Sequence, residues 1–241
     1  MELDVYSYTD QGGRSYNEDA VENRITPEGS GIFVVADGLG GHARGEEASA
    51  MAAEAIVFGW DFSEGDPAAQ MQRVFAEANA AILGLQQERG TVIKTTASAL
   101  VLTDAYAYWA NTGDSRIYRL HGNRIVSCTE DHSVAFKKYK AGEITRRQIA
   151  TDEDQSRLLR SLGSEDRFEP SIYASNEPPE PGDGYFLCSD GAWEYLQDEE
   201  IAVDFTKAQT AEQWAELLLL RIMSRVSGEH DNLSVMTVIV K

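Results

Sequence analysis

Residues 32–38 read IFVVADG, and this stretch is the clearest structural signal in the chain because five apolar residues in a row stop at Asp37. An uninterrupted apolar run of this length indicates a strand that is buried on both faces. Residues 185–191, YFLCSDG, repeat the pattern and stop at Asp190, and Asp231 precedes the apolar run that closes the chain. Three aspartates therefore lie at the ends of three predicted buried strands.

Carboxylates in such positions indicate more than a soluble surface. A buried carboxylate without a partner is costly, and several together repel one another unless cations lie between them. A single Asp-Gly pair usually marks a turn. Two such pairs at the ends of apolar strands, together with Asp231, favour a metal site. Ligation by oxygen alone selects hard cations such as Mg²⁺ or Mn²⁺ over zinc or copper.

The segment RSYNED at residues 14–19 brings further charged groups close to the N-terminus. One interpretation is a solvated loop, in which Glu18 and Asp19 have no special function. The other is that Arg14 lies beside the cations, where its guanidinium can bind two oxygens of a phosphoryl group. The residues alone leave both interpretations open.

The chain has 241 residues, 42% of them hydrophobic, with 40 acidic and 21 basic side chains and a net charge of -19. This composition excludes a disordered chain, and the negative charge disfavours nucleic acids and anionic membranes as partners. The two cysteines, Cys128 and Cys188, indicate a reducing compartment, and no apolar run reaches the length of a membrane span. We expect a cytoplasmic protein without a signal peptide, membrane insertion or nucleic-acid binding.

No linker or repeat divides the chain, so we expect residues 1–241 to form a single domain. Apolar stripes predict helices over 43–60 and after Asp66, and a capping box at Thr210 predicts another. Short alternating segments between 95 and 128 predict an antiparallel meander, because the gaps are too short for crossover helices. The predicted fold class is therefore α+β.

Eight short motifs occur in a fixed order at the predicted element boundaries. They are RSYNED at 14–19, DGLGGH at 37–42, TT at 95–96, GDSR at 113–116, DHS at 131–133, LG at 162–163, SDG at 189–191 and DNLS at 231–234. With them the chain resembles the metal-dependent protein phosphatases, the type 2C serine/threonine class, in their compact bacterial form. The resemblance implies an α-β-β-α sandwich of two antiparallel sheets flanked by helices, with a flap subdomain at about residues 133–158.

The resemblance also implies a role for each carboxylate. Asp37 is implied to bridge two Mn²⁺ or Mg²⁺ ions, and Asp190 and Asp231 to complete the coordination of one ion. Glu18 and the carbonyl of Gly38 are implied to serve the other ion, largely through water. In this mechanism a water molecule that bridges the two ions attacks phosphorus in line, and no phosphoenzyme forms.

Further residues follow from the same resemblance. Asp19 is implied as a partner close to the metal ligands, Asp114 and Asp190 as the place of a third, weaker ion, and Arg14 as the clamp on the phosphoryl group. Some members of the class carry a proposed general acid, a histidine, where this chain has Leu39. His42 is then the candidate general acid, and metal-bound water is the alternative proton donor.

The implied partners are phosphoprotein substrates and a cognate serine/threonine kinase whose action the enzyme opposes. With the pair Trp193-Glu194 the chain resembles phosphatases that oppose a threonine kinase controlling type VI secretion. Nothing in the sequence demands an oligomer, so we expect a monomer.

Three other functions remain open at this level. A non-catalytic regulator would keep the fold and bind phosphoproteins without turnover, although every predicted ligand is present. A phosphatase with an aspartyl nucleophile would use Asp152 and Asp154, but no apolar strand precedes them. A nucleotide-binding kinase would need a P-loop, and residues 90–95 lack the second glycine before Lys94.

Overall fold

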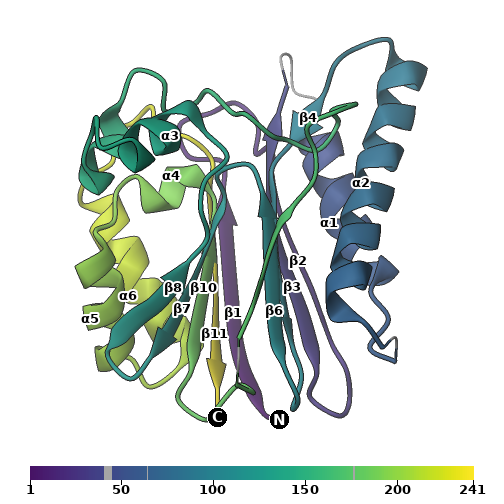
Figure 1. Cartoon of the computed structure of the whole chain (residues 1–241). Helices are drawn as coiled ribbons and strands as arrows, with labels where there is room; N and C mark the ends of the chain where they lie inside the picture. Colours follow the sequence, from purple (N-terminus) through teal and green to yellow (C-terminus); the bar gives the residue numbers. More distant parts are fainter. Residues whose placement is uncertain (41–44, 64, 176) are drawn as a thin grey trace.

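The structure is a computed structural model that describes residues 1–40, 45–63, 65–175 and 177–241. Two antiparallel sheets lie against each other in the middle of the molecule, and helices cover the outer face of each sheet (Figure 1). This four-layer arrangement confirms the predicted α-β-β-α sandwich. Within the described part of the chain, no helix is long and apolar enough to cross a membrane.

The first sheet has five strands. In sheet order they are β1 (Leu3–Asp10), β11 (Leu233–Val240), β10 (Gly184–Cys188), β7 (Arg116–His121) and β8 (Arg124–Cys128). Helices α5 (Asp198–Lys207) and α6 (Ala211–Met223) cover its outer face (Figure 1). The hydroxyl of Thr210 accepts a hydrogen bond from the backbone N–H of Gln213, which confirms the N-cap. The predicted capping box is not complete, because the side chain of Gln213 accepts from the N–H of Gln209 rather than from that of Thr210.

The second sheet has six strands. They are β2 (Asp19–Ile25), β3 (Gly31–Leu39), β5 (Ala97–Leu102), β6 (Ala107–Thr112) and β9 (Ser171–Ala174), with β4 (Lys94–Thr95) paired to the end of β3. Helices α1 (Gly45–Gly59) and α2 (Pro67–Arg89) cover its outer face. Asp66 caps α2 by accepting hydrogen bonds from the N–H groups of Ala68 and Ala69.

The apolar runs form the core, as expected. Phe33 and Val35 of β3 point toward the other sheet, where they meet Leu187 and Val238. The alternate residues of β3, such as Val34, pack instead against the helices of its own side. Both faces of β3 are therefore buried, which is why its run is continuously apolar rather than alternating.

Two details of the strands differ from the predictions. Strand β3 does not stop at Asp37 but continues to Leu39, because Gly38 and Leu39 pair with Thr95 and Lys94 of β4. The predicted meander is also not continuous, because β5 and β6 pair in one sheet whereas β7 and β8 pair in the other. Alternating patterns predict strands but do not show at which turn the chain changes sheet.

The polar segment after β8 forms short helices, as predicted. They are α3 (Val134–Lys140) and a 3₁₀ helix, η1 (Arg146–Thr151). Arg146 binds the carboxylate of Asp198 at the start of α5, with Nε 2.6 Å from Oδ2. The single domain and the boundaries of a flap within this segment stay predictions.

Candidate active site

A cavity of about 430 Å³ lies where strands of both sheets end. Six of the residues predicted for the site line it: Arg14, Glu18, Asp37, Gly38, Asp190 and Asp231. Leu39, Asn232 and Ser156, the last from the segment predicted to form the flap, lie in the same wall. The structure therefore brings together side chains from the two ends and the middle of the chain.

Two glycines allow the segments to approach this closely. A Cβ atom at Gly38 would clash with the carbonyls of Gly45 and Glu18, so the end of β3 can lie against the start of α1 only without a side chain. A Cβ atom at Gly191 would clash with the carbonyl of Asn232. The glycine after each aspartate thus places that aspartate beside a second chain segment.

The loop that carries Arg14 and Glu18 is held by Asn232. The Asn232 side-chain amide donates to the carbonyls of Gln11 and Tyr16, over 2.9 and 2.8 Å, and its Oδ1 accepts from the N–H of Glu18 at 2.8 Å. Asn232 is 6% exposed, so these bonds are shielded from water. One buried amide side chain therefore fixes the loop at both ends.

Asp37, which lines the cavity, is held through its main chain by two threonines. Its N–H donates to the hydroxyl of Thr96 at 3.0 Å, and its carbonyl accepts from the hydroxyl of Thr95 at 2.8 Å. These bonds involve only the main chain of Asp37, so its carboxylate takes no part in them. The Thr95-Thr96 motif was part of the resemblance, but the sequence did not predict that both threonines bind the main chain of Asp37.

The carboxylates of the site disfavour one another's ionised form. Burial and repulsion by Asp190 raise the pKa of Asp37 well above its usual value. Burial, followed by repulsion from Asp231, raises the pKa of Asp190 to about 6. Burial raises the pKa of Asp19 to about 7, although Ser189 donates a hydrogen bond to its Oδ2 at 2.7 Å. The uncompensated negative charge makes the cavity attractive to cations.

The donor set fits hard divalent cations. It consists of oxygen atoms only, and Asp19 Oδ1 is buried without a hydrogen-bond partner. Among the described residues no three acidic, histidine or cysteine side chains are already arranged as a complete ligand cage. Three of the carboxylates accept hydrogen bonds within the protein: Glu18 from the N–H of Gly45 at 3.0 Å, Asp231 from Arg14 at 2.7 Å, and Asp19 from Ser189.

Asp114 lies just outside the cavity lining. It sits in the turn between β6 and β7, is 4% exposed, and has a pKa raised well above the usual value by burial and by repulsion from Asp190. Asp114 and Asp19 therefore interact electrostatically with the cluster without lining the cavity. The predicted general acid, His42, lies outside the described residues.

The alternative motifs do not form the sites that they would need. Asp152 and Asp154 both bind the ammonium of Lys138 at 2.8 Å, and no strand leads into them. Gly90 is the C-terminal cap of α2, and Lys94 begins β4, which is followed by another strand rather than by the helix of a P-loop.

The four-layer fold and the oxygen-lined cavity fit a metal-dependent phosphatase, and comparison with known proteins shows the family. The family model of protein phosphatase 2C matches residues 11–218, so the chain belongs to the protein phosphatase 2C family and is a serine/threonine protein phosphatase. A curated relative, serine/threonine phosphatase stp of Listeria monocytogenes, is 29% identical over 95% of this chain and 93% of its own length.

Two solved structures show the same architecture. The serine/threonine phosphatase of S. agalactiae is 26% identical and superposes with a TM-score of 0.85 over 99% of this chain and all of that chain. The catalytic domain of the serine/threonine protein phosphatase PstP, solved in complex with two manganese ions, is 27% identical with a TM-score of 0.81 over 99% of both chains.

Proposed function

We propose that this phosphatase hydrolyses phosphoserine and phosphothreonine by direct attack of water, without a phosphoenzyme, in the cavity formed by Asp37, Asp190 and Asp231. The observation that carries the proposal is the convergence of these three aspartates on one cavity beside Arg14, although they lie far apart in the chain. Buried carboxylates with raised pKa values in a cleft, here Asp37 and Asp190, are typical of a functional site.

Asp37, Asp190 and Asp231 would hold two Mn²⁺ or Mg²⁺ ions, with Glu18 and the Gly38 carbonyl on the second ion. Such ions, when bound, supply positive charge that lowers the pKa of water toward neutrality and neutralises phosphoryl oxygens. The two manganese ions of the related PstP support this number. A third ion near Asp114 is part of the proposal as the weakest of the three.

Arg14 would bind the phosphoryl group. Its side chain is 59% exposed at the rim of the cavity, where a phosphorylated side chain can reach it. A guanidinium presents two parallel N–H donors that match two phosphate oxygens. The described residues that line the cavity include no cysteine or histidine, so neither a thiolate nor an imidazole is available there as a nucleophile.

The alkoxide of serine or threonine needs a proton when it leaves. Leu39 lines the cavity where some members of the class carry a histidine, so this position supplies no acid here. His42 stays the candidate donor among the side chains, with water at the cations as the alternative.

The biological setting is also part of the proposal. The enzyme would act as a monomer in the cytoplasm and oppose a serine/threonine kinase. The two free thiols support a reducing compartment such as the cytoplasm. The link to type VI secretion rests on the pair Trp193-Glu194 and stays a prediction.

The test is phosphate release from a panel of phosphothreonine and phosphoserine peptides, with and without Mn²⁺. We expect hydrolysis with the metal, none in excess chelator, and loss of activity in Asp37→Asn and Asp190→Asn. The exposed Asp166→Asn is the matched control and should behave as the wild type.

Full activity in excess chelator would overturn the proposal. Peptide binding without any release of phosphate, with metal supplied, would identify a non-catalytic regulator instead. A trapped phosphoaspartate would identify the aspartyl mechanism.

A further inference from the structure

The turn that carries Asp114 is held firmly on one side by His132. The N–H of His132 donates to the carbonyl of Gly113 at 2.8 Å, and the N–H of Gly113 donates to Nδ1 of His132 at 3.2 Å. Nδ1 is therefore an acceptor, so Nε2 carries the proton and donates to the hydroxyl of Ser171 at 2.8 Å. Gly113 has a φ of +102°, which lets the chain cross between the sheets at this turn.

The other side of the turn is held by Trp193. The indole N–H of Trp193 donates to the main-chain carbonyl of Asp114 at 2.9 Å in a buried environment. Trp193 is the last residue of the short helix α4 (Asp190–Trp193), whose first residue is Asp190. One hydrogen bond therefore joins the turn that carries Asp114 to the single helical turn that carries Asp190.

This bond acts against a repulsion. The charges of Asp114 and Asp190 repel each other, and that repulsion adds to the effect of burial on Asp114. Without a tie, the turn and the helix could relieve the repulsion by moving apart. The hydrogen bond from the Trp193 indole opposes this movement without involving either carboxylate, in addition to the pairing of Cys188 with Arg116 between β10 and β7.

The orientation of the indole is fixed by a buried ion pair. The guanidinium carbon of Arg116 lies 3.5 Å from the centre of the Trp193 ring. Arg116 binds Asp131 through two hydrogen bonds of 2.8 and 2.7 Å and also donates to the hydroxyl of Tyr118 at 3.1 Å. Because the guanidinium cannot turn, the ring stacked on it keeps its N–H aimed at the Asp114 carbonyl.

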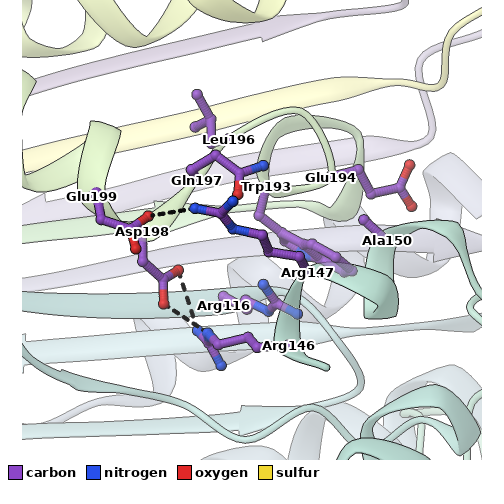
Figure 2. A pocket seen from close by; sticks show the side chains of 10 residues that line it. All are labelled: Arg116, Arg146, Arg147, Ala150, Trp193, Glu194, Leu196, Gln197, Asp198 and Glu199. Atoms are coloured by element: carbon purple, nitrogen blue, oxygen red, sulfur yellow. Dashed lines mark hydrogen bonds and ion pairs between the residues drawn. The ribbon is translucent and has the colours of Figure 1, made fainter. Parts of the chain in front are cut away.

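Figure 2 shows Trp193 and Arg116 together in the wall of a second cavity, of about 150 Å³, between η1 and the start of α5. The outer wall contains Arg146 and Arg147, which pair with Asp198 and Glu199. Trp193 therefore lines this cavity and also donates to the turn that carries Asp114.

The bond is not a general property of tryptophans in this core. Trp60, Trp109 and Trp214 are all buried, and each has an indole N–H without a hydrogen-bond partner. All four tryptophans lie in the described part of the chain, and Trp193 alone uses its indole N–H. The other three contribute packing, so they provide internal controls.

We infer that Trp193 is a positioning residue: through the Asp114 carbonyl and the α4 helix it sets the separation of Asp114 and Asp190 and thereby the affinity of the outermost cation. This inference rests on the proposed function, which places a third ion at these two carboxylates. Groups that orient metal ligands without touching the metal typically change its affinity by about 10- to 100-fold when they are removed.

The test compares Trp193→Phe with Trp214→Phe. Phenylalanine keeps an aromatic ring for Arg116 but has no donor for Asp114. Trp214 belongs to the same core cluster as Trp193 and has no partner for its N–H, so its variant reports the effect of losing an indole from this core. Both variants should lose comparable thermal stability.

The first measurement is hydrogen exchange of the metal-free protein. In Trp193→Phe we expect main-chain amides over residues 111–117 to exchange about fivefold faster, the effect of losing one hydrogen bond. Trp214→Phe should leave this segment unchanged. Equal exchange in the two variants would overturn the inference, and this result does not depend on any metal.

The second measurement is calorimetric titration with Mn²⁺. Trp193→Phe should weaken the weakest class of sites about tenfold and leave the tight class unchanged. In an Asp114→Asn background the same substitution should have no further effect. Unchanged affinity of the weakest class in Trp193→Phe would overturn the inference, whereas a wild type that binds no Mn²⁺ would overturn the proposed function instead.

If Trp193→Phe does not fold, an NMR titration of the wild-type protein can still test the inference. The four indole ¹⁵N–H signals can be assigned with Phe variants of the other three tryptophans. Titration with Mg²⁺ should shift the Trp193 signal over the concentrations that fill the weakest site, and the other signals should stay in place. A Trp193 signal that does not move would overturn the inference.

Discussion

The guanidinium of Arg14 lies 2.7 Å from the carboxylate of Asp231, although 217 positions separate the two residues. They meet because β1 and β11 pair antiparallel, so that Asp10 lies opposite Leu233 and the loops beyond these residues are neighbours. Both side chains are partly exposed at the cavity. The proposed phosphoryl clamp and one of the proposed cation ligands are therefore in contact before substrate arrives.

Arg14→Ala should lower kcat/KM for a phosphothreonine peptide by about 10- to 100-fold, because charge-assisted hydrogen bonds contribute about 1.5–3 kcal/mol. The affinity for Mn²⁺ should not fall, since the variant removes a positive charge from the neighbourhood of Asp231. Steady-state kinetics and a metal titration check both statements. Arg14→Lys, which keeps the charge but not the fork, should recover only part of the loss. A variant with unchanged kcat/KM would contradict a role in phosphoryl binding.

The metal-free protein should become more stable as the pH falls from 8 to 6.5. The pKa of Asp19 is raised to about 7 and that of Asp190 to about 6, both mainly by burial, whereas in the unfolded chain both are fully ionised in this range. The folded state therefore takes up protons that the unfolded state does not, and its stability rises as the pH is lowered. The melting temperature should rise by about 2 °C or more, the shift that 1 kcal/mol gives in a domain of this size.

A variant of Asp19 tests the cause of this pH dependence, and the measurements should stop at pH 6.5. Asp19→Asn should reduce the slope, because its amide does not titrate, whereas Glu194, whose pKa is raised to about 8 mainly by burial, still takes up a proton in this range. An unchanged slope would contradict the assignment. The series ends at pH 6.5 because burial lowers the pKa of His132 to about 4, so that protonation of the unfolded chain opposes folding below that point. Saturating Mn²⁺ should reduce the slope, since bound cations keep the carboxylates ionised.

Gly191→Ala should destabilise the protein by about 1–3 kcal/mol, because the added Cβ would clash with the carbonyl of Asn232 and force the two segments apart. The Mn²⁺-dependent rise in melting temperature should shrink at the same time, since Asp190 and Asp231 lie on those segments. Gly84→Ala is the matched control: nothing lies within 4 Å of the added Cβ in helix α2, and stability should rise by about 0.5–1 kcal/mol. Denaturant unfolding measures both variants, and equal effects would contradict the packing argument.

Asn232→Ala should lower stability by about 1–3 kcal/mol, because it leaves main-chain groups of Gln11, Tyr16 and Glu18 without partners in a shielded place. Exchange of amides over residues 11–18 should accelerate, and KM for phosphopeptides should rise as Arg14 loses its fixed position. Asn123→Ala, in the exposed turn between β7 and β8, is the control without such bonds. Unchanged exchange over 11–18 would show that the loop is held by other contacts.

Much of the architecture was predictable from local patterns. The caps at Asp66 and Thr210 are local, since each side chain binds N–H groups two or three residues ahead, and the structure confirms both. The buried strands were predictable because a continuous apolar run has no other place than a core. The roles of the site residues stay proposals, and the structure places six of the predicted residues in the lining of one cavity.

Other features were not predictable, because they depend on contacts between distant segments. The extension of β3 to Leu39 exists only because β4 lies beside it. The change of sheet at Gly113 has no counterpart in an alternating pattern, and it is this change that brings Asp114 toward Asp190. The tie through Trp193 was likewise invisible, since nothing in its neighbours distinguishes an indole that donates from one that only packs.

The amino-acid sequence alone determined which apolar runs form buried strands, that α2 and α6 begin after Asp66 and Thr210, and that the apolar runs at 32–36 and 185–188 lead to Asp37 and Asp190. Folding decided which carboxylates share one cavity and which polar side chains hold them there. The physical reason is that apolar periodicity and capping act over a few residues, whereas like charges are held together only by the free energy of the whole packed structure. That energy comes from core contacts far from the site, such as those of Phe33 and Val238 between the sheets.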